Sequence, residues 1–141
     1  MRVFLDTGVL VAAFATRGIC ADVMRLVLTE HEFVTGKPVF RELRRILIER
    51  LRLPTRVADQ VIPFLREHGH VSDPRQPAPW PESDTHDRWI LASALEANTD
   101  VLVTGEPTLL DVGEQASLHI TDPRGFWKLI RHPLDDHGDE G

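Results

Sequence analysis

A chain of 141 residues can form one domain with a sizeable core but is too short for two. Its charged fraction of 27% excludes a disordered chain, and its net charge of −6 excludes broad, non-specific attraction to nucleic acid. No apolar run is long enough to cross a membrane, and the first residues run directly into a strand pattern without the segments of a signal peptide. The single cysteine, Cys20, is expected as a half-buried core residue. These features predict a cytoplasmic protein that does not contact membranes.

Predicted strands and helices alternate along the chain. Strands are expected at residues 2–5, 32–35, 70–72, 100–104 and 118–121. Helices are expected over residues 9–14, 21–30, 38–51, 55–68, 84–97 and 123–130, with a short helical turn at 107–111. Such alternation with short links is typical of a parallel sheet that is covered on both faces. The predicted fold class is therefore α/β, a three-layer α/β/α sandwich with a central, mostly parallel sheet.

A proline-rich stretch over residues 74–81 is the one segment that resembles a linker. The elements before it supply too few strands for an independent sheet, so we interpret it as a loop inside a single domain. That domain is expected to span residues 1–131. Residues 132–141 are polar and lack periodicity, which predicts a disordered tail.

Two carboxylates directly follow predicted strands. Asp6 follows the first strand, and Glu106 follows the strand at residues 100–104. Because the carboxyl ends of parallel strands meet at one edge of a sheet, we expect these two side chains to converge there. The alternative for Asp6 alone is an ordinary helix N-cap.

Two further carboxylates lie on helices. Asp87 shares a helical face with Ile90 and Leu91, which predicts that it points toward the buried side. Its alternative is also an N-cap, but nearby residues can already cap this helix, namely Ser83, Asp84 and Thr85. Glu42 lies at the margin of an apolar stripe, from which it can reach into a cleft, and its alternative is a surface ion pair with Arg45 or another neighbour.

Several carboxylates in one cleft repel one another, so such a cluster is tolerated mainly when a divalent cation neutralises it. Oxygen ligands select hard ions such as Mg²⁺ or Mn²⁺, and ions held in this way position water and stabilise charge on phosphate oxygens. The histidine pairs are not expected to form a rival metal site: His68 and His70 flank a glycine in an apparent loop, and His132 and His137 lie in the predicted tail.

A cluster of arginines lies on the predicted helix over residues 38–51 and just beyond it. Arg41, Arg45 and Arg52 project to one side of that helix, away from its apolar stripe. We interpret them as a surface for phosphate groups or a partner protein. The alternative is a solvated helix face with spaced ion pairs.

Four segments occur in a characteristic order over residues 2–131: "VFLDTGVLVAAF", "FRELRRIL", "DTHDRWILASALEANTDVLVTGEPTLL" and "ITDPRGFWKLI". Together they resemble the PIN-domain family, and in particular the PIN-type toxin components of prokaryotic toxin–antitoxin pairs. The resemblance implies an α/β/α sandwich, a Mg²⁺- or Mn²⁺-dependent endoribonuclease, and neutralisation by a cognate antitoxin protein. The implied partners are an RNA substrate and that antitoxin, with a homodimer left open, and the arginine surface would contact RNA or a partner.

The acidic residues of the family carry over onto Asp6, Glu42 and Asp87, and Glu106 stands at a fourth position that is usually Asp. The resemblance therefore predicts these four residues as the catalytic and metal-binding set. Thr104 matches a polar residue that is often found beside the site.

Two departures from the family pattern bear on activity. The family usually has Asn where this chain has Gly8, and Glu106 is one methylene longer than Asp. Both changes alter the surroundings of the expected metal, so a weakened activity is expected. Asp84 and Asp111 are nearby acids that could compensate.

Two other functions compete with a nuclease. A degenerate, non-catalytic PIN-like protein would bind RNA or a partner through its arginine-rich helices. A phosphatase of the haloacid-dehalogenase type also ends its first strand on a nucleophilic Asp, but it requires a second Asp at the place of Gly8.

Overall fold

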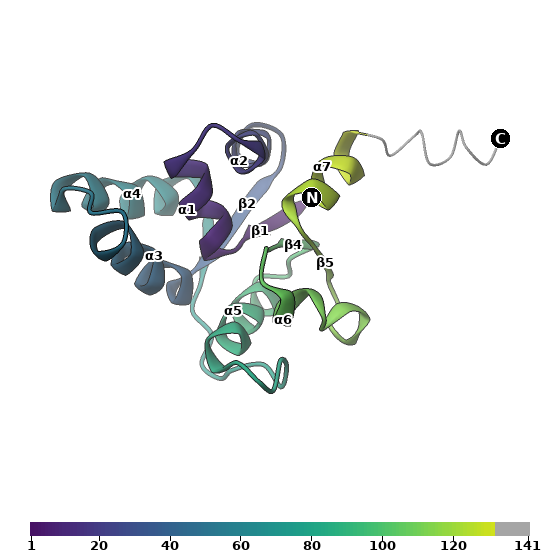
Figure 1. Cartoon of the computed structure of the whole chain (residues 1–141). Helices are drawn as coiled ribbons and strands as arrows, with labels where there is room; N and C mark the ends of the chain where they lie inside the picture. Colours follow the sequence, from purple (N-terminus) through teal and green to yellow (C-terminus); the bar gives the residue numbers. More distant parts are fainter. Residues whose placement is uncertain (132–141) are drawn as a thin grey trace.

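A five-stranded sheet forms the centre of the computed structural model, which describes residues 1–131 (Figure 1). The strands are β1 (Arg2–Leu5), β2 (Glu32–Gly36), β3 (His70–Ser72), β4 (Val101–Val103) and β5 (His119–Thr121). All neighbouring pairs are parallel, and the spatial order is β3-β2-β1-β4-β5. The predicted tail, residues 132–141, lies outside the described residues.

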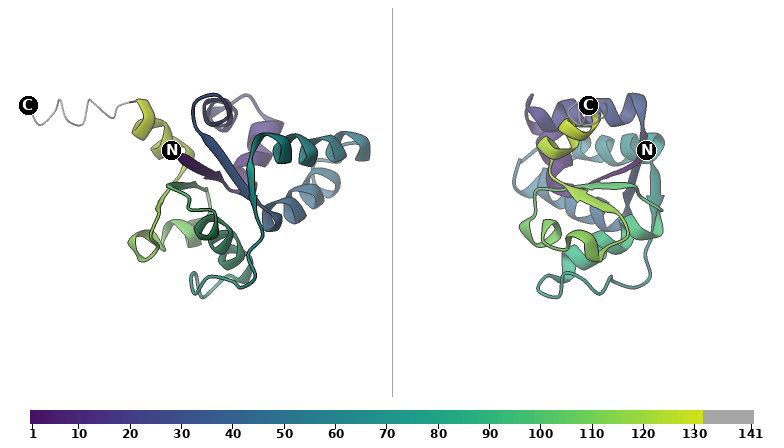
Figure 2. Two further views of the ribbon diagram at one scale, coloured as in Figure 1. Left: turned by 180° about the vertical axis from the view of Figure 1, so that it is seen from behind. Right: turned by 90° about the vertical axis from the view of Figure 1, so that its right-hand side faces the viewer.

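Helices cover both faces of this sheet. They are α1 (Thr7–Ala15), α2 (Ile19–Glu30), α3 (Lys37–Glu49), α4 (Thr55–His68), α5 (Thr85–Glu96), α6 (Pro107–Leu110) and α7 (Pro123–Arg131), with a short 3₁₀ turn at Gly113–Gln115. In Figure 1, α5 and α6 lie below the sheet, and α1, α2 and α7 lie above it. Figure 2 shows the same layering from behind and from the side. The predicted α/β/α sandwich is thereby confirmed.

The central strands β1 and β4 are apolar from Val3 to Leu5 and from Val101 to Val103, because both faces of the sheet are covered. Phe4 and Leu102, at the middle of β1 and β4, are fully buried and pair in register. Runs of this kind are typical of parallel sheets, whose strands contact helices on both sides. Cys20 is partly buried and packs against this core, as predicted.

Helix α3 ends earlier than the sequence pattern predicts. Its last residue is Glu49, and Arg52 has a φ of 52°, so the chain leaves the helix through a left-handed residue. Just beyond it, the backbone N–H of Leu53 donates to the carbonyl of Leu47 at 3.0 Å, so the chain folds back on the last turn of the helix. The prediction that Arg52 lies on a helix face with Arg41 and Arg45 is therefore wrong.

The loop predicted around His68 and His70 is also absent. His68 is the last residue of α4 and His70 is the first residue of β3. Gly69 connects the two elements directly, and a Cβ there would lie 2.5 Å from the Phe33 ring.

Helix α5 packs closely against the carboxyl end of β2. A Cβ on Gly36 would lie 1.8 Å from Ser93 Oγ, so only glycine permits this approach. The Ser72 hydroxyl, at the end of β3, donates to the Ser93 carbonyl at 2.8 Å. These contacts fix the position of α5 relative to the edge where the strands end.

No helix within residues 1–131 combines the length and the apolar character needed to cross a membrane.

Candidate active site

Asp6 lies at the carboxyl end of the central strand β1 and is buried. Its Oδ1 accepts a hydrogen bond of 2.7 Å from the backbone N–H of Thr7, and its Oδ2 accepts one of 2.6 Å from the Thr104 hydroxyl. We predict Asp6 as a site residue in place of a helix cap. The structure shows that it is also the N-cap of α1, so the exclusion of capping is wrong. Capping uses Asp6 Oδ1, and Asp6 Oδ2 accepts its hydrogen bond from Thr104, which follows β4.

Asp87 is buried in the first turn of α5, as the apolar stripe predicts. The helix is capped by Asp84, whose Oδ1 accepts from the backbone N–H of Asp87 at 3.0 Å. The carboxylate of Asp87 is thus free of a capping role, also as predicted. Its Oδ2 accepts a hydrogen bond from the hydroxyl of Thr108, in α6.

The four carboxylates named from the sequence all line one cavity of about 180 Å³ at the carboxyl edge of the sheet, namely Asp6, Glu42, Asp87 and Glu106. Asp6 and Glu106 follow β1 and β4, whereas Glu42 and Asp87 come from α3 and α5. Gly8 lines the same cavity, and a Cβ built on it meets no atom within 4 Å. Convergence of these side chains therefore has the geometry that the parallel sheet predicts, while their role as ligands stays a prediction.

The two acids proposed as compensating residues lie elsewhere. Asp84 is occupied as the cap of α5 and does not line the acidic cavity. Asp111 lines a different cavity of about 390 Å³, together with Trp80 and Thr108. Neither acid lines the acidic cavity, and their compensating role stays a prediction.

His86 was not predicted as a site residue, yet it lines the acidic cavity and forms an ion pair with Glu42. The surface pair with Arg45, considered for Glu42, does not form, because Arg45 contacts Glu49 at 3.9 Å instead. Glu42 and His86 belong to different helices, so no spacing in the sequence could reveal their contact. The only local signal is that His86 directly precedes Asp87.

Burial dominates the electrostatics of the site. It raises the pKa of Asp6 to about 6, with additions from the charges of Asp87 and Glu42, against the lowering effect of the hydrogen bonds from Thr104 and Thr7. Burial likewise raises the pKa of Asp87, and the neighbouring charge of Asp84 adds to this. The hydrogen bond to Glu42 raises the pKa of His86. A bound cation would relieve the cost of holding these carboxylates ionised in one place.

The donor set suits a hard divalent cation, because all four candidate ligands are carboxylates. As the side chains lie, however, no three acidic, histidine or cysteine groups within residues 1–131 form a ready ligand group. Three of the carboxylates are engaged by other partners: Asp6 by Thr7 and Thr104, Glu42 by His86, and Asp87 by Thr108. A cation would bind through the lone pairs that these contacts leave free, or in place of the contacts.

The predicted arginine surface divides into two parts. Arg41 and Arg45 line a second cavity next to the acidic one. Arg52 lies beyond the end of α3 and lines neither cavity. Arg50, the C-cap of α3, lines the acidic cavity instead.

No known protein-family profile matches the sequence, and no curated protein matches it. The fold does match solved structures. One is a structure of VapBC-1 from nontypeable Haemophilus influenzae, with a TM-score of 0.64 and 20% identity, covering 88% of this chain and 99% of that chain. Another is VapBC2 from Rickettsia felis bound to a DNA fragment from their promoter, with a TM-score of 0.60 and 13% identity, covering 86% of this chain and 98% of that chain.

A third match is FitAB bound to an IR36 DNA fragment, with a TM-score of 0.60 and 14% identity over 86% of this chain and 94% of that chain. All three are toxin–antitoxin structures that contain PIN-domain toxins. The resemblance to PIN-type toxins that the sequence motifs carry is thus confirmed at the level of the fold.

Proposed function

We propose that this chain is a metal-dependent endoribonuclease that acts as the toxin of a toxin–antitoxin pair. The observation that carries the proposal is the convergence of Asp6, Glu42, Asp87 and Glu106 on one cavity at the carboxyl edge of the sheet. The shared fold with toxin–antitoxin structures supports it. RNA phosphodiester hydrolysis is the reaction that a carboxylate-held Mg²⁺ or Mn²⁺ serves.

Asp6, Glu42, Asp87 and Glu106 would hold the ion or ions. A metal bound there supplies an oriented, activated water and stabilises negative charge on the phosphate. The chain's own contribution is to fix the ligands: the Thr104 hydroxyl orients Asp6, and the Thr108 hydroxyl orients Asp87. Arg50 adds positive charge at the same cavity, where the scissile phosphate would lie.

The proposal includes a cognate antitoxin as partner and a cytoplasmic site of action, where both RNA and antitoxin are made. The matched structures are complexes of VapBC and FitAB, two of them with DNA, which supports a protein partner for this chain. A second copy of the chain is a further candidate partner.

A degenerate, non-catalytic protein is the second candidate. Gly8 and Glu106 favour it, because Gly8 contributes no side chain to the cavity and Glu106 is exposed and longer than Asp. The space around Gly8 can accept an asparagine side chain, so both departures can be reversed by substitution.

Cleavage of a labelled RNA pool by the purified protein tests the proposal, in Mn²⁺, in Mg²⁺ and in EDTA. We expect weak, metal-dependent cleavage that Asp87→Asn abolishes and that Glu106→Asp increases. Glu96→Gln is the matched control, since it changes an exposed carboxylate at the other end of α5 that lines no part of the cavity. If the natural protein never cleaves RNA while the Gly8→Asn, Glu106→Asp protein cleaves readily, the degenerate function is correct.

A further inference from the structure

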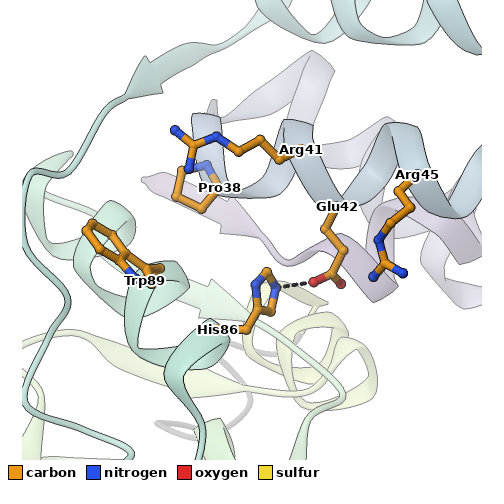
Figure 3. Close-up of a pocket in the computed structure, with 6 residues that line it drawn as sticks. All are labelled: Pro38, Arg41, Glu42, Arg45, His86 and Trp89. Atoms are coloured by element: carbon orange, nitrogen blue, oxygen red, sulfur yellow. Dashed lines mark ion pairs between the residues drawn. The ribbon is translucent and has the colours of Figure 1, made fainter.

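A second cavity of about 350 Å³ lies beside the acidic one, between α3 and α5 (Figure 3). Glu42 and His86 line both cavities, so the two are neighbours with a common wall. The remaining lining residues of the second cavity are Pro38, Arg41, Arg45 and Trp89. In Figure 3, Glu42 and Arg45 extend from α3 toward the side of His86, whereas Arg41 extends over Pro38. The proposed metal site does not include Pro38, Arg41, Arg45 or Trp89.

Trp89 differs in its surroundings from the other two tryptophans of the chain. Trp80 and Trp127 pack against the hydrophobic core, whereas the described core and the side chains packed on it do not include Trp89. Trp89 is half-buried and follows His86 by three residues, which places both on one side of α5. A large aromatic ring that lines a polar cavity is suited to stacking on a planar ligand.

Arg41 and Arg45 lie one turn apart on α3, and both are exposed. Within residues 1–131, Arg41 forms no ion pair and Arg45 has only the 3.9 Å contact with Glu49. By contrast, Arg44 on the same helix is paired with Asp59 of α4 at 3.1 Å. In a chain with a net charge of −6, two weakly paired guanidinium groups beside an aromatic ring make a local anion site.

We propose that Trp89, Arg41 and Arg45 form a subsite for one nucleotide of single-stranded RNA next to the bond that is cleaved. The base stacks on the Trp89 indole, and the two phosphates that flank it pair with the guanidinium groups of Arg41 and Arg45. A base in a duplex is already stacked and paired, so the subsite selects unpaired RNA. The inference rests on the proposed function, which places the cleaved bond in the acidic cavity. Glu42 and His86 line both cavities, so the subsite lies next to that bond.

RNA binding tests the subsite separately from cleavage. Binding of a fluorescein-labelled, single-stranded RNA of about ten nucleotides, a length within the usual site size, is measured by anisotropy in the Asp87→Asn background. We expect Trp89→Leu to weaken binding roughly ten-fold and Trp89→Phe to weaken it by less than about three-fold, because Phe can still stack. We also expect RNA to quench the tryptophan fluorescence, and the quench to be lost in Trp89→Phe.

The charge of the subsite is tested by the Arg41→Gln, Arg45→Gln double variant. We expect it to lower the slope of log affinity against log salt concentration by about 1.4, since each phosphate contact with a single strand contributes about 0.7. Arg44→Gln, Arg56→Gln is the matched control, because it removes the same charge from α3 and α4 at residues that do not line the cavity. Thermal unfolding by circular dichroism shows whether each variant is folded.

The outcomes separate the subsite from the proposed function. If the natural protein cleaves RNA but the Trp89 and arginine variants bind and cleave as it does, the subsite is wrong and the nuclease stands. If these variants lose RNA binding although no protein cleaves RNA, the subsite stands and the nuclease is wrong. Equal affinity for an RNA duplex of the same sequence contradicts the subsite. Loss of antitoxin binding with unchanged RNA binding also contradicts it, and assigns the cavity to the partner protein.

Discussion

The hydroxyl of Thr104 donates a 2.6 Å hydrogen bond to the Asp6 carboxylate, although the two residues lie 98 positions apart in the sequence. The Thr104 hydroxyl oxygen also accepts a 3.0 Å hydrogen bond from the backbone N–H of Glu106. One buried hydroxyl therefore connects the carboxylate after β1 with the loop that carries the acid after β4. This connection gives Thr104 a measurable role in both stability and metal binding.

We predict that Thr104→Val lowers the free energy of unfolding by about 1–3 kcal/mol, because it leaves the buried Asp6 carboxylate with one hydrogen bond fewer. Valine has nearly the shape of threonine, so the loss reports the hydroxyl and not a cavity. Urea unfolding measures the stability, and calorimetric titration with Mn²⁺ is expected to show weaker binding. Thr104→Ser is the control that keeps the donor. A Val variant as stable as the natural protein would mean that the hydroxyl contributes little.

The pKa of Asp6, raised to about 6, predicts how stability depends on pH in the absence of metal. The folded protein binds the Asp6 proton more tightly than the unfolded chain, whose Asp titrates near 3.9. Folding stability from this group therefore falls as pH rises from about 4 to 6, by up to about 3 kcal/mol. We expect Asp6→Asn to remove this fall and to be the more stable protein at pH 7.5 in EDTA.

Urea unfolding in EDTA at pH 4.5 and pH 7.5 measures that difference. Asp111→Asn is the control, since Asp111 is exposed and does not line the acidic cavity. Addition of Mn²⁺ at pH 7.5 is expected to stabilise the natural protein and not Asp6→Asn. An unchanged fall between the two pH values in Asp6→Asn would assign the effect to other groups.

His86 competes with a metal ion for the Glu42 carboxylate, because the two side chains form an ion pair. We predict that His86→Gln strengthens Mn²⁺ binding by up to about five-fold, the equivalent of the roughly 1 kcal/mol of a partly exposed ion pair. The pKa of His86 is raised, so the variant's advantage is expected to shrink as pH rises above this pKa and the imidazole loses its charge. His119→Gln, at an exposed position on β5, is the control. Weaker Mn²⁺ binding by His86→Gln would instead make His86 a residue that positions Glu42.

Close packing at Gly36 predicts a large effect from a single methyl group. A Cβ there would lie 1.8 Å from Ser93 Oγ, so we expect Gly36→Ala to destabilise the fold by about 1–3 kcal/mol. Ser93→Ala removes the clashing atom, and the double variant is expected to recover part of the loss in a double-mutant cycle. Gly8→Ala is the control, because nothing lies within 4 Å of its Cβ and alanine favours the helix. Equal stability of the Gly36 and Gly8 variants would contradict this account of the α5 position.

Much of the fold could be predicted because β1 and β4 are short apolar runs and several long helices have an apolar stripe. Helix α4 begins and ends where the sequence pattern places it, at Thr55 and His68. The end of α3 could not be predicted, because a left-handed helix end is usually marked by glycine and here Arg52 takes that conformation. The sequence therefore lacks the usual stop signal. Its pattern predicts Arg52 on the helix, which ends at Glu49.

The acidic cavity could be predicted from chain topology, since residues after parallel strands converge whatever their separation in sequence. The sequence could not decide whether Asp6 caps α1 or lines the cavity, because one carboxylate can do both. Its Oδ1 accepts from Thr7, and its Oδ2 accepts from Thr104. His86 and Trp89 were missed because their partners lie on another helix. Contacts between side chains of two packed helices depend on how those helices are placed, which no spacing within one helix encodes.

The sheet order places β1, which precedes the other four strands of the sheet in the sequence, between β2 and β4. Its partner residues on β4 emerge only at Val101–Val103, and Glu106 follows them. A chain still being synthesised therefore lacks one neighbour of its central strand, and the Asp6 carboxylate lacks its Thr104 donor, until most of the protein has emerged. The carboxylate cavity thus cannot assemble before the chain through Glu106 is available, whereas β1 and β2 can pair earlier.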